Sequence, residues 1–207
     1  MTEHTAQQLV HTLQENGVLK SSKLRDAFLQ IDRKDFIPAE FQEQAYSDYP
    51  LQIGYDQTIS QPSTVAFMLE LLDPKQGEKI LDIGSGSGWT TALLAFLVGS
   101  KGKVFGVELV PKLVAFGAEN LKKYNFPQAA ILQAGKNLGL AKEAPFDKIL
   151  VSAAAQDFPE TLLSQLKEGG TLVIPVRDAI WSCKKLSQGK AEIKKFEGFA
   201  FVPLITS

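Results

Sequence analysis

The chain reads Lys79-Ile80-Leu81-Asp82-Ile83-Gly84-Ser85-Gly86-Ser87-Gly88 where an apolar run meets three alternating glycines. The apolar run is typical of a buried strand, and a helical pattern follows over residues 90–98. Glycine permits a tight turn and lets a ligand approach the backbone, because it has no Cβ. The next helix offers unpaired N–H groups to anions. The segment therefore predicts a strand–loop–helix unit that holds a nucleotide-like ligand.

The spacing of the glycines narrows the choice of ligand. Dinucleotide-binding loops usually read G-x-G-x-x-G, whereas a single residue separates Gly86 from Gly88 here. The form D-x-G-x-G-x-G is more typical of S-adenosylmethionine sites, where an acid such as Asp82 can interact with the cationic amino group of the methionine portion. Glu108 ends the next expected strand, where an acid is placed to hold two ribose hydroxyls. A plain glycine-rich turn beside an incidental surface acid is the simpler alternative.

Seven residues of this region are candidate binding residues for S-adenosylmethionine. They belong to the first strand, the loop and the tip of the second strand, and they are Asp82, Gly84, Ser85, Gly86, Gly88, Glu108 and Leu109.

Composition excludes several classes of function. The 207 residues, 44% hydrophobic and 22% charged, suit one globular domain. A net charge of −1 without a basic stripe argues against nucleic-acid binding. The apolar runs are shorter than the ~20 residues of a membrane span, no signal peptide is recognised, and no His/Cys/carboxylate cluster has metal spacing. We expect a cytoplasmic monomer without a nucleic-acid or membrane partner.

The pattern of expected helices and strands changes near residue 77. Residues 1–76 read as a helical and irregular segment, with helices expected before Gly17, after Ser21 and from Pro62. From Lys79 onward, strands (80–83, 104–107, 129–133, 147–152 and 171–175 after a Gly169-Gly170 turn) alternate with helices (90–98, 111–124 and 159–166). A terminal antiparallel pair is expected over 180–186 and 194–202.

This alternation predicts an α/β fold, a doubly wound Rossmann-like sheet with a terminal antiparallel hairpin. Its ligand would lie at the carboxyl ends of the strands. We expect one compact domain, in which residues 1–76 pack on a core of residues 77–207.

A second motif precedes the helix expected at Pro62. Residues 53–62 read Ile-Gly-Tyr-Asp-Gln-Thr-Ile-Ser-Gln-Pro, which is too rich in hydroxyls and amides to be core. Thr58 and Ser60 lie near a helix N-terminus, which favours an anion by ~0.3–1 kcal/mol. N-terminal capping is the simpler interpretation, since Ser and Thr are favoured caps. The alternative is a carboxylate-binding wall that faces the cofactor.

Motifs along nearly the whole chain resemble the protein-L-isoaspartate O-methyltransferase family of bacterial type. Gln57–Pro62 matches the family signature "GQTISQP" except at its first residue, and Leu81–Gly88 matches its S-adenosylmethionine loop. Further segments resemble "VxRxxFVP" (31–38), "AYxD" (45–48), "APFDxI" (144–149), "LKPGGRLVIPV" (166–175) and "FVPL" (201–204). The resemblance implies methyl transfer from S-adenosylmethionine to L-isoaspartyl residues of damaged proteins or peptides, as a repair reaction. It also implies that Ser60 is the catalytic residue on which methyl transfer in the family depends. Thr58 is the second catalytic candidate.

Two positions depart from the family pattern. Asp56 stands where the family usually has glycine, so an acid could repel a carboxylate substrate unless it points to solvent. Gly135 takes the place of the aspartate of "GDGxxG", whose acid helps to bind the adenine. Gly135 is therefore a candidate cofactor-binding position that lacks a side-chain acceptor. The loss would cost ~0.5–1.5 kcal/mol, which weakens binding without abolishing it.

Transfer of a methyl group to a carboxylate needs no general base, because a carboxyl group with a pKa near 4 is already ionised at neutral pH. The enzyme has to align one oxygen with the methyl–sulfur axis and remove its water. Neutral donors such as Thr58 and Ser60 suit this task, since a strong ion pair would stabilise the ground state. Two alternatives stay open: a methyltransferase with a different acceptor, and a non-catalytic ligand-binding protein.

Overall fold

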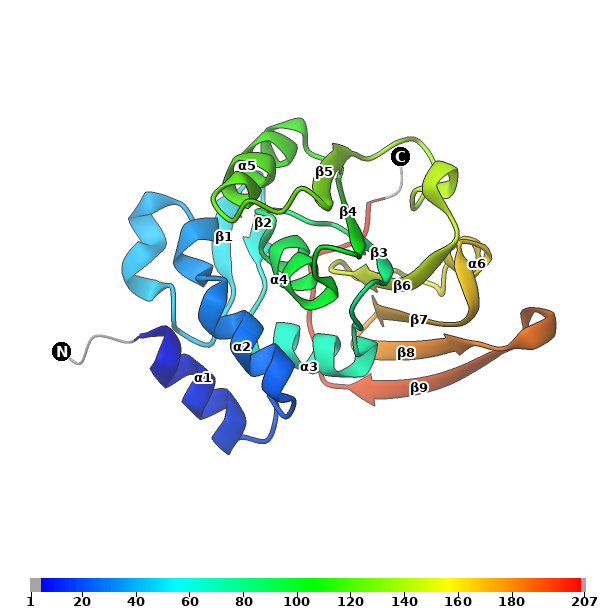
Figure 1. Ribbon diagram of the computed structural model, residues 1–207, viewed down its shortest axis with the longest axis horizontal. Helices are drawn as coiled ribbons and strands as arrows, with labels where there is room; N and C mark the ends of the chain where they lie inside the picture. Colours follow the sequence, from blue (N-terminus) through cyan, green and yellow to red (C-terminus); the bar gives the residue numbers. More distant parts are fainter. Residues whose placement is uncertain (1–4, 206–207) are drawn as a thin grey trace.

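The computed structural model describes residues 5–205; residues 1–4, which the expectation about a signal peptide concerns, and residues 206–207 lie outside them. In the described part the main sheet has seven strands in the order β5-β4-β3-β6-β7-β8-β9 (Figure 1). Strands β3 to β7 pair in parallel, whereas β8 and β9 are antiparallel. The order reverses at β3, which lies between β4 and β6. Such a switch point is where open α/β sheets bind ligands.

The central strands are apolar because both faces of the sheet are covered. Strands β3 (Lys79–Ile83), β4 (Lys103–Glu108), β5 (Ala129–Gln133) and β6 (Phe146–Val151) occupy one half. Strands β7 (Leu166–Val176), β8 (Ala179–Lys185) and β9 (Ala191–Glu197) complete the sheet. Alternate residues face opposite ways, so Ile80 belongs to one hydrophobic cluster and Leu81 to another.

Helices cover the two faces unequally. Helices α3 (Pro62–Leu72), α4 (Trp89–Val98) and α5 (Pro111–Lys122) pack on the face that Ile80 shares. The short α6 (Glu160–Ser164) packs on β7 at the other face, and η3 (Ala141–Glu143) lies in the connection between β5 and β6. The predicted α/β class with a terminal antiparallel hairpin is confirmed.

The N-terminal segment joins the same core as the sheet. Helix α1 (Ala6–Glu15) begins with a capping box at Thr5, and α2 (Ser22–Gln30) is capped by Ser21. Two 3₁₀ turns, η1 (Arg33–Phe36) and η2 (Ala39–Gln44), lead to a hairpin of β1 (Leu51–Gly54) and β2 (Gln57–Ile59). Leu13, Phe28 and Phe36 share one cluster with residues of α3 and α4. None of the helices in residues 5–205 is long and apolar enough to span a membrane.

Two expectations about the C-terminal strands were wrong. Gly169-Gly170 is a bulge inside β7 and not a turn before it, because the register with β6 shifts there. Strand β9 ends at Glu197, after the turn η4 (Ser187–Gly189), and does not reach Val202. Gly198, with φ +92°, turns the chain away from the sheet, and residues 199–205 form a C-terminal tail.

Candidate active site

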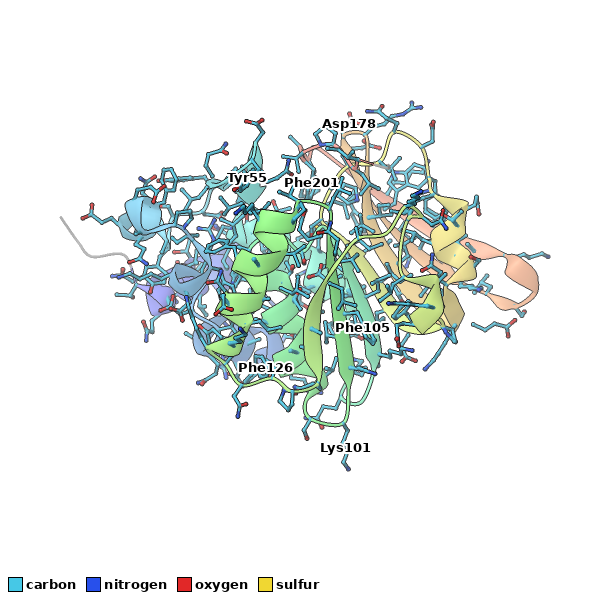
Figure 2. All side chains as sticks on the ribbon, turned by 90° about the horizontal axis from the view of Figure 1, so that it is seen from above. Tyr55, Lys101, Phe105, Phe126, Asp178 and Phe201 are labelled. Carbon is cyan, nitrogen blue, oxygen red and sulfur yellow. The ribbon has the colours of Figure 1, made fainter. Side chains whose placement is uncertain are left out.

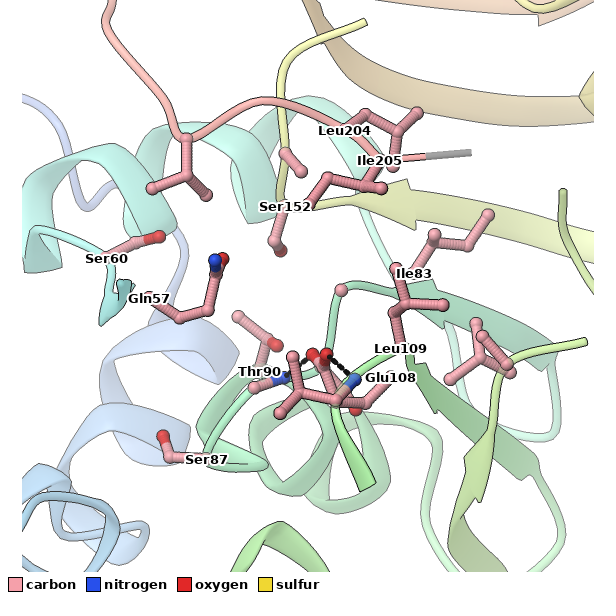
Figure 3. A pocket seen from close by; sticks show the side chains of 18 of the residues that line it. Gln57, Ser60, Ile83, Ser87, Thr90, Glu108, Leu109, Ser152, Leu204 and Ile205 are labelled. Carbon is pink, nitrogen blue, oxygen red and sulfur yellow. Dashed lines mark hydrogen bonds between the residues drawn. The ribbon is translucent and has the colours of Figure 1, made fainter. Parts of the chain in front are cut away.

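A cleft opens at the carboxyl ends of β3, β4, β5 and β6 (Figure 3). Its sheet side consists of residues 83–87, 107–110, 134–139 and 152–153. Its other side consists of Ile53, residues 57–60 and residues 202–205. About 1080 Å³ of space lies between these walls, part of it open to solvent. Figure 2 shows Tyr55 and Phe201 at this end of the molecule, and Lys101 at the opposite end.

The glycine loop forms the floor of the cleft. Gly84, Gly86 and Gly88 all have positive φ, at +75°, +50° and +89°. At Gly88, which caps α4, a Cβ would lie 2.8 Å from Ile131 Cδ1 and 3.0 Å from the Gly117 carbonyl oxygen. Helix α5 therefore presses directly against the loop, and only glycine fits there.

Glu108 ties the loop to the tip of β4. Its Oε2 accepts from the Gly86 N–H at 2.9 Å and its Oε1 from the Val110 N–H at 2.9 Å (Figure 3). Each carboxylate oxygen keeps acceptor capacity after these bonds. Glu108 is 7% exposed and lines the cleft, followed by Leu109. This placement suits the role predicted for Glu108 toward hydroxyl donors.

Asp82 lies beneath the loop and does not line the cleft. Its Oδ2 accepts from the hydroxyls of Thr90 and Thr91 at 2.7 and 2.6 Å, while Oδ1 has no hydrogen-bond partner among the described residues. Burial raises the pKa of Asp82 to about 6, although both threonine bonds act to lower it. The predicted contact with a cationic amino group stays a prediction, and the unpartnered Oδ1 is the atom that could make it.

The loop has one further support and one unpartnered hydroxyl. The Asn120 side chain of α5 donates to the Ser87 carbonyl at 3.0 Å, and Asn120 is buried. The Ser85 hydroxyl is buried against the cleft without a hydrogen-bond partner among the described residues. A floor of open backbone, an accepting carboxylate and an unpartnered hydroxyl together fit an adenosine ligand that carries a small polar tail.

The opposite wall is formed by the β1–β2 hairpin and the start of α3. Tyr55 and Asp56 form its tight turn with φ +56° and +57°, a conformation that glycine adopts at less cost. Asp56 is exposed at this turn and lines neither the cleft nor the adjoining hollow described next. Thr58 and Ser60 both line the cleft.

Behind this wall lies a smaller hollow that adjoins the cleft. Its lining includes Pro50, Gln61, Thr64 and the tail residues 200–202. Thr58, Ser60, Ser152 and Val202 line both spaces. The hydroxyl groups of the sequence motif therefore stand where the two spaces meet.

Arg33 holds this wall from below. Its guanidinium donates to the carbonyls of Ala45, Ser47, Tyr49 and Ser60 at 2.8–3.3 Å. Arg33 is only 2% exposed, and burial lowers its pKa to about 10, so it remains a cation at neutral pH.

Asp48 fixes the same segment from the other end, where α3 begins. Its Oδ1 accepts from the Ser63 N–H at 2.8 Å, and its Oδ2 from the Gln61 amide at 3.3 Å. The buried Arg33 therefore holds the Ser60 carbonyl, and the half-buried Asp48 holds the Ser63 N–H.

The C-terminal tail closes the third side. The Ala154 N–H donates to the Val202 carbonyl at 2.8 Å, and the Leu204 N–H to the Ala154 carbonyl at 2.8 Å. Phe199 stacks on Phe67 of α3 with ring centroids 5.3 Å apart. These contacts place residues 202–205 over the cleft instead of in the sheet.

Comparison with known proteins supplies the family. The sequence profile of "Protein-L-isoaspartate(D-aspartate) O-methyltransferase (PCMT)" matches residues 4–207. The chain belongs to the protein-L-isoaspartate O-methyltransferase family. A family member of that name from Methanopyrus kandleri is 43% identical over 96% of this chain and 90% of its own. One from Thermococcus onnurineus is 43% identical over 95% of this chain and 91% of its own.

A solved structure of a family member has the same fold over its whole length. The chain from Plasmodium falciparum, described as a complex with S-adenosyl-L-homocysteine, superposes with a TM-score of 0.87 at 28% identity. The match covers 100% of both chains. The family resemblance seen in the sequence motifs is thereby confirmed.

The structure brings most of the predicted site residues of this family member to one cleft. Gly84, Ser85, Gly86, Glu108, Leu109, Gly135, Thr58 and Ser60 line it, whereas Asp82 and Gly88 support it from below. At Gly135 a Cβ would meet nothing within 4 Å, so the missing side chain leaves open space.

Sequence reasoning missed Gln57, Ser152 and the tail as parts of the cleft. Gln57 belongs to the quoted motif, and Ser152 ends the fourth expected strand at the edge where ligands bind, so position alone could have indicated both. The tail carried no such signal, because its apolar residues also suit a strand.

Proposed function

We propose that this protein transfers a methyl group from S-adenosyl-L-methionine to the free carboxylate of L-isoaspartyl residues in damaged proteins or peptides. One observation carries the proposal: the glycine-floored cleft and the smaller hollow meet at Thr58, Ser60 and Ser152. A donor in the first space and an acceptor in the second would face each other at that junction. The named relatives and the complex with S-adenosyl-L-homocysteine support this function.

The lining of the smaller hollow suits a carboxylate nucleophile. Its described residues carry no charged side chain and offer hydroxyl and amide groups. An ionised carboxylate needs donors that orient it, but a strong ion pair would hold back the attack. Neutral donors meet both needs, because they orient the carboxylate without a strong ion pair.

The reaction needs no proton transfer from the protein. When bound, S-adenosylmethionine supplies an activated methyl group on a positively charged sulfur. The acceptor oxygen forms a bond to the methyl carbon while the carbon–sulfur bond breaks, and the electron pair stays on sulfur. Ser60 and Thr58 would orient the acceptor, and residues 84–88 with Glu108 would hold the donor.

A paired-peptide assay tests the function. Methyl incorporation is measured with an isoaspartyl peptide and with its normal aspartyl twin, and binding of S-adenosylhomocysteine is measured by calorimetry. We expect methylation of the isoaspartyl peptide alone. Binding without methylation of it would indicate a different acceptor. Failure to bind at millimolar concentration would indicate a non-catalytic protein.

Further expectations from the sequence belong to the same proposal. We propose a cytoplasmic monomer with no nucleic-acid or membrane partner, in which residues 1–76 bring the acceptor motif to the core of residues 77–207. Light scattering of the purified protein at micromolar concentration tests the oligomeric state, and a dimer mass would contradict it.

A further inference from the structure

Ser152 occupies a position that the sequence motifs did not single out. It is the residue after β6, and β6 pairs with β3 at the point where the strand order reverses. Thr58, Ser60 and Ser152 are the hydroxyl-bearing residues, among those described, that line both the cleft and the smaller hollow. Thr58 and Ser60 come from the hairpin and the segment before α3, whereas Ser152 comes from the sheet.

The backbone of Ser152 is fixed beside the glycine loop. Its N–H donates to the Ile83 carbonyl at 2.9 Å. Its Cβ lies 4.0 Å from the place that a Cβ on Gly84 would take, so the side chain begins directly next to the loop. A rigid strand end gives better positional precision than a loop does.

The side chain of Ser152 points into the space between the walls. Figure 3 shows its hydroxyl facing the Gln57 amide, with Ser60 on the far side of that amide. Among the described residues, Ser152 forms its hydrogen bond through the backbone N–H, and its hydroxyl makes none. A neutral donor therefore faces Ser60 across the junction of the two spaces.

We propose that Ser152 is a third acceptor-binding hydroxyl, which donates to the substrate carboxylate from the sheet side while Ser60 acts from the hairpin side. The proposal rests on the proposed function. A carboxylate has two oxygens, and only one attacks the methyl group. Donors on two sides fix the rotation of the carboxylate, which donors on a single wall leave free. Ser152 and Ser60 thus hold the attacking oxygen toward the loop.

The test compares four variants on the isoaspartyl peptide. Ser152→Ala removes the donor, Ser152→Thr keeps it, and Ser60→Ala serves as the comparator on the opposite wall. Ser182→Ala is the matched control, because Ser182 is a half-buried serine of β8 that lines neither space. KM and kcat are measured for the peptide, and the Kd of S-adenosylhomocysteine by calorimetry.

We expect Ser152→Ala to lower kcat/KM for the peptide about three- to tenfold, as the loss of one neutral hydrogen bond implies. The Kd of S-adenosylhomocysteine should stay within about twofold. Ser152→Thr should recover most of the loss, and Ser182→Ala should match the unaltered protein. A merely structural role would move ligand affinity and melting temperature together and would not be rescued by threonine.

Two outcomes overturn the inference. An unchanged kcat/KM in Ser152→Ala would show that the hydroxyl does not touch the acceptor. A parallel loss of S-adenosylhomocysteine affinity would assign Ser152 to the donor side instead. If the unaltered protein itself fails to methylate the isoaspartyl peptide, the proposed function fails, which is a separate result.

Discussion

The two walls of the cleft are held in different ways. The donor wall consists of strand ends and the glycine loop, and its supports are a sheet and the close contact of α5 at Gly88. The acceptor wall consists of a short hairpin and an irregular segment, and its supports are the charged side chains of Arg33 and Asp48. Strand ends and close backbone packing therefore position the donor wall, with Glu108 and Asn120 as additional ties, whereas the side chains of Arg33 and Asp48 position the acceptor wall. Removing the support of the acceptor wall should therefore impair peptide methylation, and removing the support of the donor wall should impair ligand affinity, each without the other.

The largest effect is expected from Arg33→Met. The change keeps an apolar stem but leaves the carbonyls of Ala45, Ser47, Tyr49 and Ser60 without their donor. The Ala45 carbonyl is buried and the Ser47, Tyr49 and Ser60 carbonyls are partly buried, and such groups without partners cost free energy, so we expect the free energy of unfolding to fall by roughly 3 kcal/mol. Peptide methylation should fall by about a hundredfold at least, because the lost free energy loosens the segment that carries Ser60. Chemical denaturation and steady-state kinetics measure the two effects.

The exposed Arg177 offers a matched control. It donates to the Gln156 carbonyl and pairs with Asp157 at the surface, with a side chain that is 69% exposed. Arg177→Met should leave stability and methylation nearly unchanged. If Arg33→Met weakened S-adenosylhomocysteine binding as much as methylation, the two walls would not be independent.

The corresponding change on the donor side is Gly117→Ala. The added Cβ would lie 2.8 Å from the Gly86 carbonyl oxygen and 3.3 Å from the Gly88 nitrogen, so helix or loop must shift. We expect the Kd of S-adenosylhomocysteine to rise by roughly tenfold, because overpacking costs typically ~1–3 kcal/mol and here it acts on the binding loop. The peptide KM should change little. Calorimetry and kinetics distinguish these results.

Gly102→Ala provides the control for overpacking. Its Cβ would collide with Val98 Cβ and lie 2.9 Å from the Glu78 carbonyl oxygen. Gly102 directly follows Lys101, which Figure 2 shows at the end of the molecule opposite to the cleft. Gly102→Ala should lower stability without changing ligand affinity. Equal weakening in both variants would mean that Gly117→Ala acts through general loosening of the fold.

This contrast also explains how much of the site could be predicted from sequence. The glycine loop of the donor wall is a run of consecutive residues, so the strand, the loop and the helix around it could be predicted from their spacing, while the binding roles of its residues stay predictions. The support from Arg33 depends on carbonyls that lie 12 to 27 residues away, and no periodicity records such bonds. The expectation that the last strand reaches Val202 was wrong for a related reason. Phe199 and Val202 suit a strand pattern, but Phe199 stacks on Phe67 and the Val202 carbonyl accepts from Ala154, and these contacts lead residues 202–205 over the cleft.

Asp82 permits a test by pH. Its pKa of about 6 in the folded protein exceeds the ordinary value of 3.8, mainly because of burial, so the folded state holds the proton more tightly. Stability from this group is therefore full below about pH 4 and is lost as pH rises to 6, by ~3 kcal/mol at most. If Asp82 meets the ligand's amino group, binding favours the ionised acid. Affinity for S-adenosylhomocysteine should then fall up to about tenfold between pH 7.5 and 5.

Two controls isolate that carboxyl group. Asp82→Asn should remove the step in affinity, and methylthioadenosine, which lacks the amino group, should not show the step with the unaltered protein. A step of equal size with methylthioadenosine would show that the contact between Asp82 and the amino group does not cause the pH dependence.

The smallest effect is expected from Gly135→Asp, which should strengthen ligand binding at the donor wall instead of weakening it. Family resemblance places an acid at this position, and a Cβ here would meet nothing within 4 Å. Gly135 has no positive φ, so the aspartate brings no backbone strain. A regained acceptor for the adenine amino group should tighten S-adenosylhomocysteine binding about three- to tenfold. Gly135→Ala adds the Cβ without an acceptor and should not tighten it. Equal affinities of the aspartate and alanine variants would show that the adenine is held by other groups of the cleft, because the acceptor would then contribute nothing.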